Sequence, residues 1–399
     1  MRAGMSRGHD LRLLVGARAL FPAMVAAIDA AQHSVHLETY IFDPRGQAQA
    51  LVEALARAAR RGVRVHVVVD GVGTGPVPAA VAALWFAAGV QWEVFAPLGR
   101  LGLLLPSGWR RLHRKLCVVD AAQAFCGGIN VLDDWLEPGR APLAKPRLDY
   151  AVQVSGPLVA DIQSSMQRLW WRAVAAQRLR DAEWAAVLRA VRTSTPPRTA
   201  SPSPTERTGV WAQFLERDNL RHRRRIERSY LRAIGRAQHD VLLAHAYFVP
   251  GRRMRKALRQ AVARGVRVQV LLQSRYENFM QFHAAQPVHH ALMRAGVALY
   301  AYQASALHGK VAVIDGVWAT VGSSNLDPLS LLLAREANVV VHDAAFAQGL
   351  RQQLLQAITV DSQRLDPVRW AQRPWRERFL DRLAFALMRL ALFLTGQRY

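Results

Sequence analysis

Apolar and polar residues follow one another along this chain in patterns that predict helices alternating with strands. An apolar helical pattern over residues 16–31 leads into 34–42, which is rich in β-branched and aromatic residues and is typical of a strand. Residues 47–61 have the spacing of a helix that Gly62 ends, and the valine-rich segment 63–69 is typical of the next strand. A strand, helix, strand order predicts a right-handed crossover and a mostly parallel sheet with helices on its faces.

The same order recurs in the second half of the chain. Residues 241–248 correspond to the first strand, 252–264 to the helix that follows it, and 265–273 to residues 62–70. Self-similarity on this scale indicates a duplication and predicts two halves related by a pseudo-twofold axis. The predicted fold class is therefore α/β, with two fused α/β/α halves built on central mixed, largely parallel sheets.

Composition changes divide the chain into segments. A strand over 149–155 and a helix over 156–191 complete the first half, and the Ser/Pro-rich stretch 193–208 is the clearest linker. The predicted organisation is a first half over 1–192, this linker, a second half over 209–372, and a C-terminal amphipathic, membrane-associated helix over 373–399.

One short motif occurs in both halves with the spacing His-x-Lys-x4-Asp. Each copy is followed by a glycine-containing turn and an asparagine. The candidate site residues are the histidine, lysine and aspartate of each copy together with those asparagines: His113, Lys115, Asp120, Asn130, His308, Lys310, Asp315 and Asn325. A spacing repeated at two distant places indicates that both copies contribute to one active site.

Charge and composition point to an anionic partner. The chain has 399 residues and a formal net charge of +24, which favours either nucleic acid or an anionic membrane surface as partner. Nearly all the basic residues are arginines. Only four lysines and five asparagines occur, and the two motif copies hold two of each. Lysine and asparagine retained at matched places in such a sequence indicate a function for them.

The chain contains two cysteines, which cannot form a disulfide framework and favour a reducing compartment. Cys117 and Cys126 lie in apolar, strand-like surroundings, so we expect buried and inert thiols. The first twelve residues are polar and mixed, so a secretory signal is not expected there. No apolar run reaches the length that spans a bilayer.

The motif residues suit the chemistry of a phosphodiester. Alternate residues of a strand share a face, so each histidine is expected beside its lysine, whereas Asp120 and Asp315 should face away and play a supporting part. The glycines let the backbone approach an anion closely, and Asn130 and Asn325 can donate to its oxygens. No cluster of His, Cys and carboxylate residues has metal-ligand spacing. We therefore expect no metal and no other cofactor, with the two lysines in the place of a cation.

The two copies differ in detail. Gly127-Gly128 precedes the first asparagine where Ser323-Ser324 precedes the second, so the halves are expected to divide their roles. Glu38 and His245 are expected at matching positions in the first strand of each half, with either a structural role or a role in the site.

Two segments have the character of a membrane-contacting surface. The loop 97–111 is apolar, tryptophan-bearing and cationic, which fits either a segment packed on the core or a lip that enters lipid beside the site. Residues 375–393 have an amphipathic helical pattern whose charged residues fall in about a third of the circumference. We expect the wide apolar face of this helix to bind a membrane surface in preference to the body of the protein.

The motifs resemble those of the phospholipase D superfamily, and longer strings are similar to bacterial cardiolipin synthases, the B type in particular. The strings that carry this resemblance are residues 37–42, 113–130, 322–330 and 336–343. It covers nearly the whole chain except the linker and the last helix.

The resemblance implies a covalent two-step transfer. His113 would attack phosphorus to form a phosphatidyl-histidine, while His308 would protonate the leaving alcohol and then deprotonate the acceptor. The motif lysines and asparagines would stabilise the charge on the phosphoryl oxygens. The family also pairs each histidine with a carboxylate of the opposite half, here Glu336 for His113 and Asp149 for His308. The residues alone leave open which histidine is the nucleophile.

The implied activity joins two phosphatidylglycerol molecules into cardiolipin and glycerol without a metal. The implied partners are anionic phospholipids (phosphatidylglycerol and cardiolipin) and the membrane surface, and the implied location is peripheral, on the cytoplasmic side of a bacterial inner membrane. The sequence sets neither the acceptor alcohol nor the oligomeric state.

The alternative is a phosphodiesterase of the same superfamily that hydrolyses phospholipid or cleaves nucleic acid, and the net charge of +24 suits it equally. Nucleic acid is less favoured, because a nuclease needs neither of the two membrane-contacting segments. An inert lipid-binding scaffold is disfavoured because both motif copies are complete.

Overall fold

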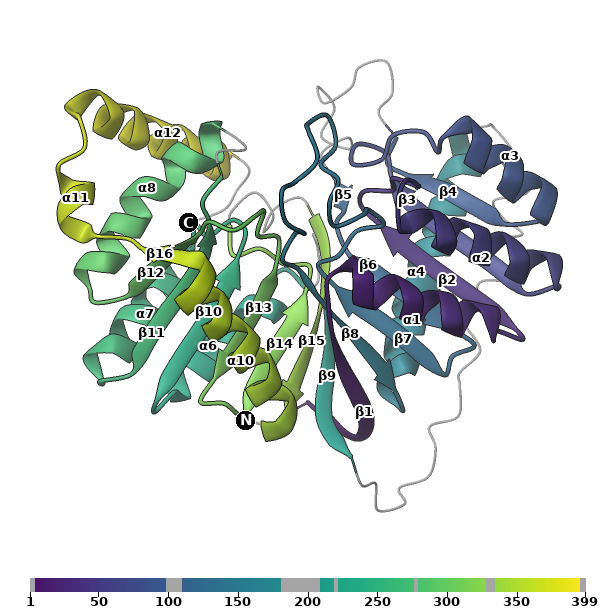
Figure 1. Cartoon of the computed structure of the whole chain (residues 1–399), viewed down its shortest axis with the longest axis horizontal. Coiled ribbons are helices and arrows are strands. Elements are labelled where there is room, and N and C mark those ends of the chain that lie inside the picture. Colours follow the sequence, from purple (N-terminus) through teal and green to yellow (C-terminus); the bar gives the residue numbers. More distant parts are fainter. Residues whose placement is uncertain are drawn as a thin grey trace.

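The computed structural model describes residues 4–97, 110–180, 209–218, 222–275, 279–327 and 334–394 of the chain. These residues form two similar α/β halves that lie side by side (Figure 1). The elements of the first half are β1 (Ser6–Val15), α1 (Ala17–Asp29), β2 (Ser34–Thr39), α2 (Ala48–Arg60), β3 (Arg64–Asp70), α3 (Ala79–Ala88), β4 (Gln91–Phe95), β5 (Arg111–Leu112), β6 (Lys115–Val119), β7 (Gln123–Gly127), β8 (Tyr150–Ser155) and α4 (Leu158–Arg180).

The second half repeats this order and then adds elements of its own. Its elements are β9 (Val210–Arg217), α6 (Arg225–Arg236), β10 (Asp240–His245), α7 (Arg252–Ala263), β11 (Arg267–Gln273), α8 (Phe279–Arg294), β12 (Ala298–Tyr302), β13 (Lys310–Ile314), β14 (Trp318–Gly322), β15 (Ala334–His342), α10 (Ala344–Asp361), β16 (Ser362–Arg364), α11 (Pro367–Ala371) and α12 (Trp375–Leu394). The predicted linker 193–208 and most of the loop 97–111 lie outside the described residues.

The strands form one 16-stranded sheet with a symmetric order. That order is β16-β12-β11-β10-β13-β14-β15-β9-β1-β8-β7-β6-β2-β3-β4, and β5 pairs with β15 to one side. With β16 and β5 set aside, equivalent strands lie at equal distances from the centre, where β1 pairs with β9. A duplicated chain folded about a pseudo-twofold axis produces this order, so the predicted α/β class with two similar halves agrees with the structure.

The sheet is mixed, as expected, but less parallel than the sequence predicted. Parallel pairing joins β2, β3 and β4, joins β10, β11 and β12, and joins β5 to β15. The other described pairs are antiparallel. The crossover argument holds only where a helix separates two strands. A short turn such as the one between β6 and β7 can join only antiparallel strands.

Strand β1 was not predicted, although it lies at the centre of the sheet. Its sequence alternates charged residues such as Arg7, Asp10 and Arg12 with apolar ones, so its segment looks polar as a whole. It pairs with β8 on one side and β9 on the other. Long-range pairing, not the local pattern, places this strand in the sheet.

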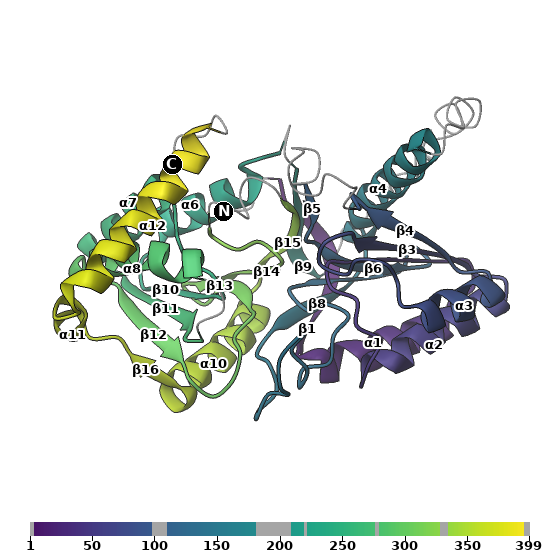
Figure 2. The ribbon, with the colours of Figure 1, turned by 90° about the horizontal axis from the view of Figure 1, so that it is seen from above.

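Three large apolar cores and one smaller cluster, which contains Leu112 and Trp170, hold the described layers together. One lies under α1, α2 and α3, and a second lies under α6, α7, α8 and α12. The third contains residues of both halves together with α4 and α10, because β7 and β8 pack against β14 and β15. Figure 2 shows α4 and α10 on the sides of their sheets opposite to the other helices. The shared core fixes the two halves relative to each other, so that side chains from both can meet in one site.

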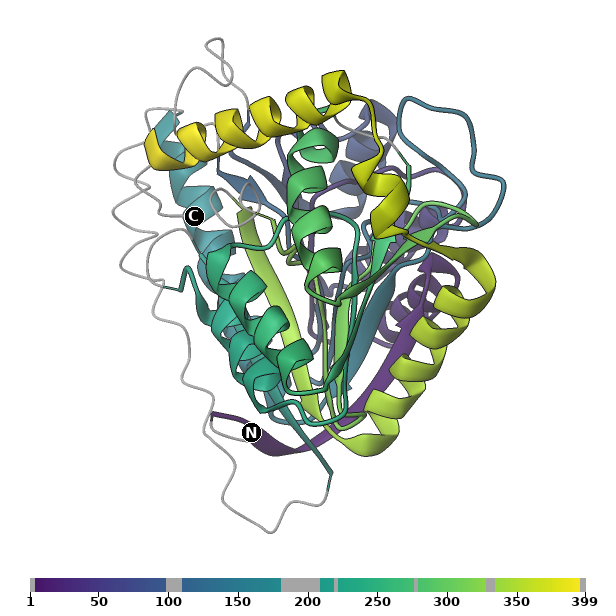
Figure 3. The ribbon, with the colours of Figure 1, turned by 90° about the vertical axis from the view of Figure 1, so that its left-hand side faces the viewer.

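Helix α12 packs along α8 and matches the helix predicted over 375–393 (Figure 3). Ala384 and Met388 are buried against the body of the protein. Asp381, which the pattern placed on the charged face, is buried too, where it accepts hydrogen bonds from Arg373 and contacts His283 at 2.7 Å. Within the described residues, no helix combines the length and apolar character needed to cross a membrane.

The outward side of α12 is apolar. Its exposed large apolar side chains are Trp375, Phe379, Leu380, Leu383, Leu387 and Leu390. At about 100° per residue these six side chains form one stripe along the helix. The exposed arginines Arg378, Arg382 and Arg389 border the stripe on one side, and the exposed Arg376 interrupts it in the first turn of the helix. We call this stripe the outer face of α12.

Candidate active site

His113 is held against the opposite half. Its backbone N–H donates to the carbonyl of Arg335 at 3.0 Å, next to the short parallel pairing of β5 with β15. The next residue of β15 is Glu336, and its fully buried carboxylate lies 3.1 Å (Oε2) and 3.0 Å (Oε1) from Nδ1 of His113. The hydroxyl of Ser323 also donates to Oε2 of Glu336. Backbone pairing between the halves therefore creates a histidine–carboxylate pair.

His308 has the same arrangement in the other direction. Its backbone N–H donates to the carbonyl of Leu148 at 2.9 Å, and the next residue, Asp149, places Oδ2 2.6 Å from Nδ1 of His308. The other oxygen of Asp149 accepts the N–H of Tyr150 at 2.8 Å. Both cross-half pairs that the family resemblance implies are thus present in the structure.

The sequence suggested that each histidine lies on the same strand as its lysine. In the structure neither histidine does. Strands β6 and β13 begin at Lys115 and Lys310, and each histidine lies two residues earlier in an extended segment outside the strand. The reason is that the backbone at each histidine bonds to the opposite half instead of to its own sheet. This departure turns both imidazoles toward the space between the halves.

Burial sets the protonation of the two imidazoles. It lowers the pKa of His113, an effect that Glu336 opposes and Lys115 reinforces. It lowers the pKa of His308 further below the ordinary value, with help from the charges of Lys310 and Lys115. Both rings are therefore neutral at pH 7. Because each Nδ1 lies against a carboxylate, its proton stays on Nδ1 and the lone pair of Nε2 is available for reaction.

The two carboxylates differ in their acidity. Burial alone would raise the pKa of Glu336, but contact with His113 and the charges of Arg217 and Lys115 outweigh it and lower the pKa. Burial raises the pKa of Asp149 to about 6 in spite of the nearby Lys310. The sequence predicted that the halves are not equivalent. The carboxylates beside the two histidines agree with this, because the pKa of Glu336 is lowered and that of Asp149 is raised.

Both motif lysines are buried and lie beneath the histidines. Nζ of Lys115 donates to the carbonyl of His113 at 2.6 Å, and Nζ of Lys310 donates to the carbonyl of His308. Burial lowers the pKa of Lys115 to about 7, with the charge of Lys310 also lowering it. The ammonium of Lys115 also lies 5.3 Å from the centre of the Tyr40 ring. The two lysines thus fix the histidine backbones from behind, and neither of them lines the pocket described below.

Asp120 and Asp315 lie at the far ends of β6 and β13, roughly 16 Å from the motif lysines at about 3.3 Å per strand residue. The carboxylate of Asp120 accepts the backbone N–H groups of residues 32, 33 and 34. That of Asp315 accepts those of residues 238, 239 and 240. Neither lines the pocket described below. They act as structural members of the motif, which agrees with the supporting role expected for them.

Asn130 and Asn325 both reach the space between the halves. Oδ1 of Asn130 accepts the N–H of Ile41 at 3.1 Å, which leaves its NH₂ group to donate elsewhere. Within the described part of the chain, the buried Oδ1 of Asn325 has no hydrogen-bond partner.

The turns before these asparagines differ, but the residues that correspond are not the ones that the sequence analysis matched. Pairing of β6 with β7 and of β13 with β14 makes Gly127 equivalent to Gly322, so Gly128 corresponds to Ser323. A Cβ at Gly128 would overlap Asp149, whereas Ser323 donates to Glu336. Each turn is therefore fitted to the carboxylate of its own half.

The two imidazoles line one pocket of about 430 Å³ between the halves. Its lining combines cations, carboxylates and aromatic side chains: Tyr40, Ile41, Arg111, His113, Ile129, Asn130, Leu132, Asp134, Glu137, Pro138, Arg147, Asp149, Tyr247, His308, Asn325 and Ala334. A pocket of this size accommodates a phosphodiester headgroup.

Sequence reasoning missed several of these residues. Tyr40 follows β2, and Tyr247 lies just after β10. The Tyr40 ring lies 5.0 Å from the ring of His113. Arg111 is held by the buried carboxylate of Asp70 at 3.2 Å, and Arg147 is fixed by the carbonyl of Leu136 at 2.7 Å. The two arginines have no equivalents in the other motif copy, so a search for repeated residues could not find them.

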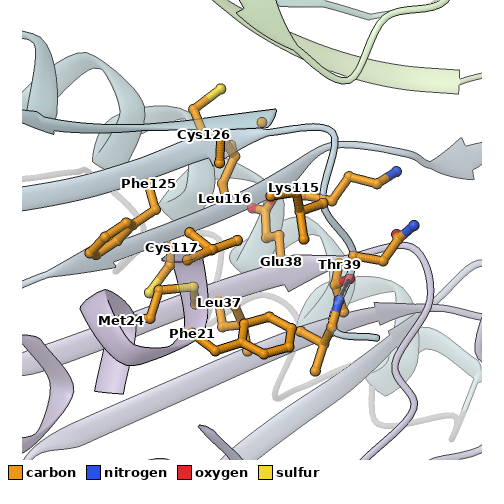
Figure 4. A pocket seen from close by; sticks show the side chains of 16 residues that line it. Phe21, Met24, Leu37, Glu38, Thr39, Lys115, Leu116, Cys117, Phe125 and Cys126 are labelled. Atoms are coloured by element: carbon orange, nitrogen blue, oxygen red, sulfur yellow. Dashed lines mark hydrogen bonds between the residues drawn. The ribbon is translucent and has the colours of Figure 1, made fainter. Parts of the chain in front are cut away.

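A second, small pocket lies behind the first motif (Figure 4). Its volume of about 20 Å³ holds no more than a water molecule. Figure 4 shows Cys117 beside Met24 on one side of the sheet and Cys126 on the other. Burial raises the pKa of both thiols to about 12. The predicted buried, inert cysteines are confirmed.

Glu38 and His245 do not occupy equivalent positions, contrary to expectation. His245 pairs with Lys310, whereas Glu38 pairs with Leu116, one residue beyond Lys115. A slip of one residue in a strand moves a side chain to the opposite face. Glu38 forms a buried ion pair with Arg114, with Nη2 to Oε1 at 2.8 Å, and neither residue lines the pocket between the halves.

Across the residues that the structure describes, no group of three His, Cys, Asp or Glu side chains is arranged to hold a metal ion.

Solved structures share this fold. The phosphatidylserine synthase of Haemophilus influenzae Rd KW20 superposes with a TM-score of 0.66 over 96% of this chain and 93% of its own, at 11% sequence identity. The polyphosphate kinase of Porphyromonas gingivalis superposes with a TM-score of 0.56 over 90% of this chain and 49% of its own, at 12% identity. The two-half architecture with its central sheet is thus a fold that these solved structures share.

Sequence comparison gives the family. A model described as "Cardiolipin synthase, PLD-like domain" matches residues 24–170 and 230–358. The cardiolipin synthase B proteins of Shigella flexneri and Escherichia coli K12 are each 37% identical over 99% of this chain and 92% of their own lengths. A cardiolipin synthase A of Pseudomonas entomophila is 32% identical over 87% of this chain and 68% of its own length. The chain belongs to the PLD-like cardiolipin synthase family, and it is an enzyme of the phosphatidyltransferase kind.

Proposed function

We propose that this protein is a cardiolipin synthase that transfers a phosphatidyl group between two phosphatidylglycerol molecules and releases glycerol. The observation that supports this most is the pocket between the halves, which both His113 and His308 line, each with a buried carboxylate from the opposite half on its Nδ1. Two such bases at one phosphorus allow a double displacement. The names of the relatives support the choice of lipid.

In the first step, Nε2 of one histidine attacks the phosphorus of phosphatidylglycerol. The bond from phosphorus to the glycerol headgroup breaks, and the other histidine donates its proton to the leaving oxygen. Following the family assignment, His113 is the nucleophile and His308 the acid. The phosphate anion favours protonation of His308 once it is bound, which offsets the lowered pKa of that residue.

In the second step, His308 takes the proton of a primary hydroxyl of a second phosphatidylglycerol. The freed oxygen attacks phosphorus, the nitrogen–phosphorus bond breaks, and cardiolipin leaves. Lys115, Lys310 and the NH₂ group of Asn130 stabilise negative charge that develops on the phosphoryl oxygens. These groups are fixed before the substrate arrives, so the site loses little energy in reorganisation.

The proposed location is the surface of the bacterial inner membrane, on its cytoplasmic side. The outer face of α12, with its flanking arginines, suits insertion among lipid headgroups. The net charge of +24 adds attraction to anionic lipids.

The test is incubation of the purified protein with phosphatidylglycerol vesicles in the presence of a chelator. We expect cardiolipin and glycerol in equal amounts, and we expect His113→Ala and His308→Ala each to abolish this activity. Quenching of one turnover with alkaline denaturant should trap the labelled phosphatidyl group on His113, because the nitrogen–phosphorus bond of a phosphohistidine survives alkali but not acid. Phosphatidic acid without cardiolipin would establish hydrolysis instead. Cleavage of single-stranded or duplex DNA with no lipid product would overturn the proposal.

A further inference from the structure

A large cavity in the second half lies beside the pocket between the halves. It has a volume of about 560 Å³ and is enclosed by the ends of β10, β11 and β12 and by α8, α11 and α12. Most of its wall is apolar. Phe248, Leu272 and Ala285 contribute on the side of the sheet and α8, and Trp370, Leu387 and Met388 contribute from α11 and α12. The volume is within the range of about 300–1,000 Å³ that is usual for small-molecule sites.

Polar groups gather at one end of this cavity. Gln273 ends β11 and Ser274 and Arg275 follow it, and the hydroxyl of Ser274 donates to the carbonyl of Tyr302, next to Gln303. Asp327 also lines the cavity. Gln286 and His289 of α8 are polar lining residues too, but they already donate to the carbonyls of Phe282 and Phe248, so the remaining wall is mostly apolar. The cavity therefore suits a ligand with a long apolar part and a polar group only at one end.

The polar end is the end next to the pocket between the halves. Tyr247 lines both spaces. Arg275 of the cavity also forms an ion pair with Glu137 of the pocket, with Nη1 3.0 Å from Oε2. One tyrosine and one ion pair thus separate a site for a phosphate from a site for an apolar chain.

Among the described residues of the first half, aromatic side chains occupy the equivalent position. Phe42 corresponds to Phe248, because Phe42 makes a parallel bridge with Val131 after β2 and Phe248 makes the equivalent bridge with Leu326 after β10. The ring of Phe42 lies 5.2 Å from that of Trp85, which is fully buried and fills the core under α3. Among the described residues of the first half, no helix corresponds to α11 or α12. The cavity is therefore a feature that the second half gained together with these helices.

We propose that this cavity binds one acyl chain of the phospholipid whose phosphate lies between His113 and His308. The inference rests on the proposed function. The occupant is an acyl chain because the wall is apolar, because its polar end meets the phosphate site, and because α12 forms part of the wall. Leu387 lines the cavity and is also 48% exposed on the outer face of α12, so a chain leaving the lipid layer can reach the cavity past this helix.

A binding experiment tests this without requiring turnover. Wild-type protein is mixed with vesicles of phosphatidylglycerol that carry a photoreactive diazirine at the end of one acyl chain, then irradiated and digested for mass spectrometry. We expect adducts on residues of the cavity wall, such as Met280 and Ala285 of α8. Adducts confined to Phe379, Leu383 and Leu390 on the outer face of α12 would overturn the proposal.

A variant that fills the cavity gives a second test. Ala285 lines the cavity and is 7% exposed, so Ala285→Phe places a ring in the space. We expect the ratio of kcat/KM for long-chain to short-chain phosphatidylglycerol to fall about tenfold, the factor that loss of burial for two methylene groups predicts. Ala345→Phe, at an exposed position of α10, is the matched control and should leave this ratio unchanged.

The outcomes separate this inference from the proposed function. An unchanged ratio for Ala285→Phe would show that the acyl chain does not enter the cavity, even if cardiolipin is made. Labelling of the cavity by a protein that makes no cardiolipin would retain the acyl site and refute the activity.

Discussion

His113 and His308 occupy equivalent positions, but their supporting residues differ. Glu336 receives a hydrogen bond from Ser323 and has a lowered pKa, whereas Asp149 lies against Gly128 and has its pKa raised to about 6. A fully charged carboxylate stabilises a positive charge on its histidine more than a weakly acidic one does. The difference gives a physical basis for divided roles at one phosphorus.

The fit between Gly128 and Asp149 predicts the effect of adding one methyl group. Gly128→Ala displaces Asp149 and turns His308 away from the phosphate, and a shift of about 1 Å in such a group lowers kcat by about 100-fold. The measurement is the steady-state rate of cardiolipin formation. Ser323→Ala, at the equivalent position, only removes a hydrogen bond and should reduce kcat less. Normal turnover in Gly128→Ala would show that Asp149 does not orient His308.

The lowered pKa of Lys115 predicts how substrate binding depends on pH. With a pKa of about 7, Lys115 is charged below pH 7 and loses its proton above it. Its attraction for the anionic phosphate therefore weakens as pH rises, and KM should increase about tenfold between pH 6 and 8.5. Lys115→Arg keeps its charge over this range and should remove the pH dependence, although kcat falls. A pH profile of KM that is the same in both proteins would assign it to another group.

At this scale the sequence predicted the repeated residues and little else. His113 and His308 could be predicted because the same motif spacing occurs twice in the chain. Glu336 and Asp149 could be predicted only from the family resemblance. Residues that occur once, such as Arg147, carry no such signal. The positions of the histidines outside the strands also depend on bonds to the opposite half, which no local pattern encodes.

Among the elements, the sequence predicted well those whose pattern is set locally. Helices α2 and α7 and strands β3 and β11 match their predicted ranges closely. The mixed character of the sheet was expected, but its antiparallel share was underestimated, because a strand's direction depends on the turn before it and not on its apolar residues. Asp120 and Asp315 show why the motif extends so far, since each ties the end of its strand to the start of the neighbouring strand.

The outer face of α12 predicts a specific loss of membrane binding. Replacing Phe379, Leu383 and Leu390 with serine removes exposed apolar side chains without touching the buried side of the helix. Because each side chain contributes about 1–2 kcal/mol when it enters an apolar phase, binding to phosphatidylglycerol vesicles should weaken at least tenfold. Co-sedimentation at constant salt measures this. Val360→Ser, at an exposed position of α10, is the control and should bind as the wild type does.

On the scale of the whole molecule, the two halves share one sheet and one of the three cores. Neither half can unfold without exposing apolar surface of the other. Calorimetry should therefore show a single thermal transition whose calorimetric and van't Hoff enthalpies agree. Two separate transitions would show that the halves are independent domains, as the predicted boundaries at 192 and 209 had implied.

Strand β1 leads to a consequence for synthesis on the ribosome. It is made before β9, which lies about 200 residues later in the chain and completes one of its edges. During that interval the nascent first half presents an open strand edge, and such edges pair readily with other chains. Full-length translation is thus needed to cover this edge, and a chain truncated before β9 would be prone to aggregation.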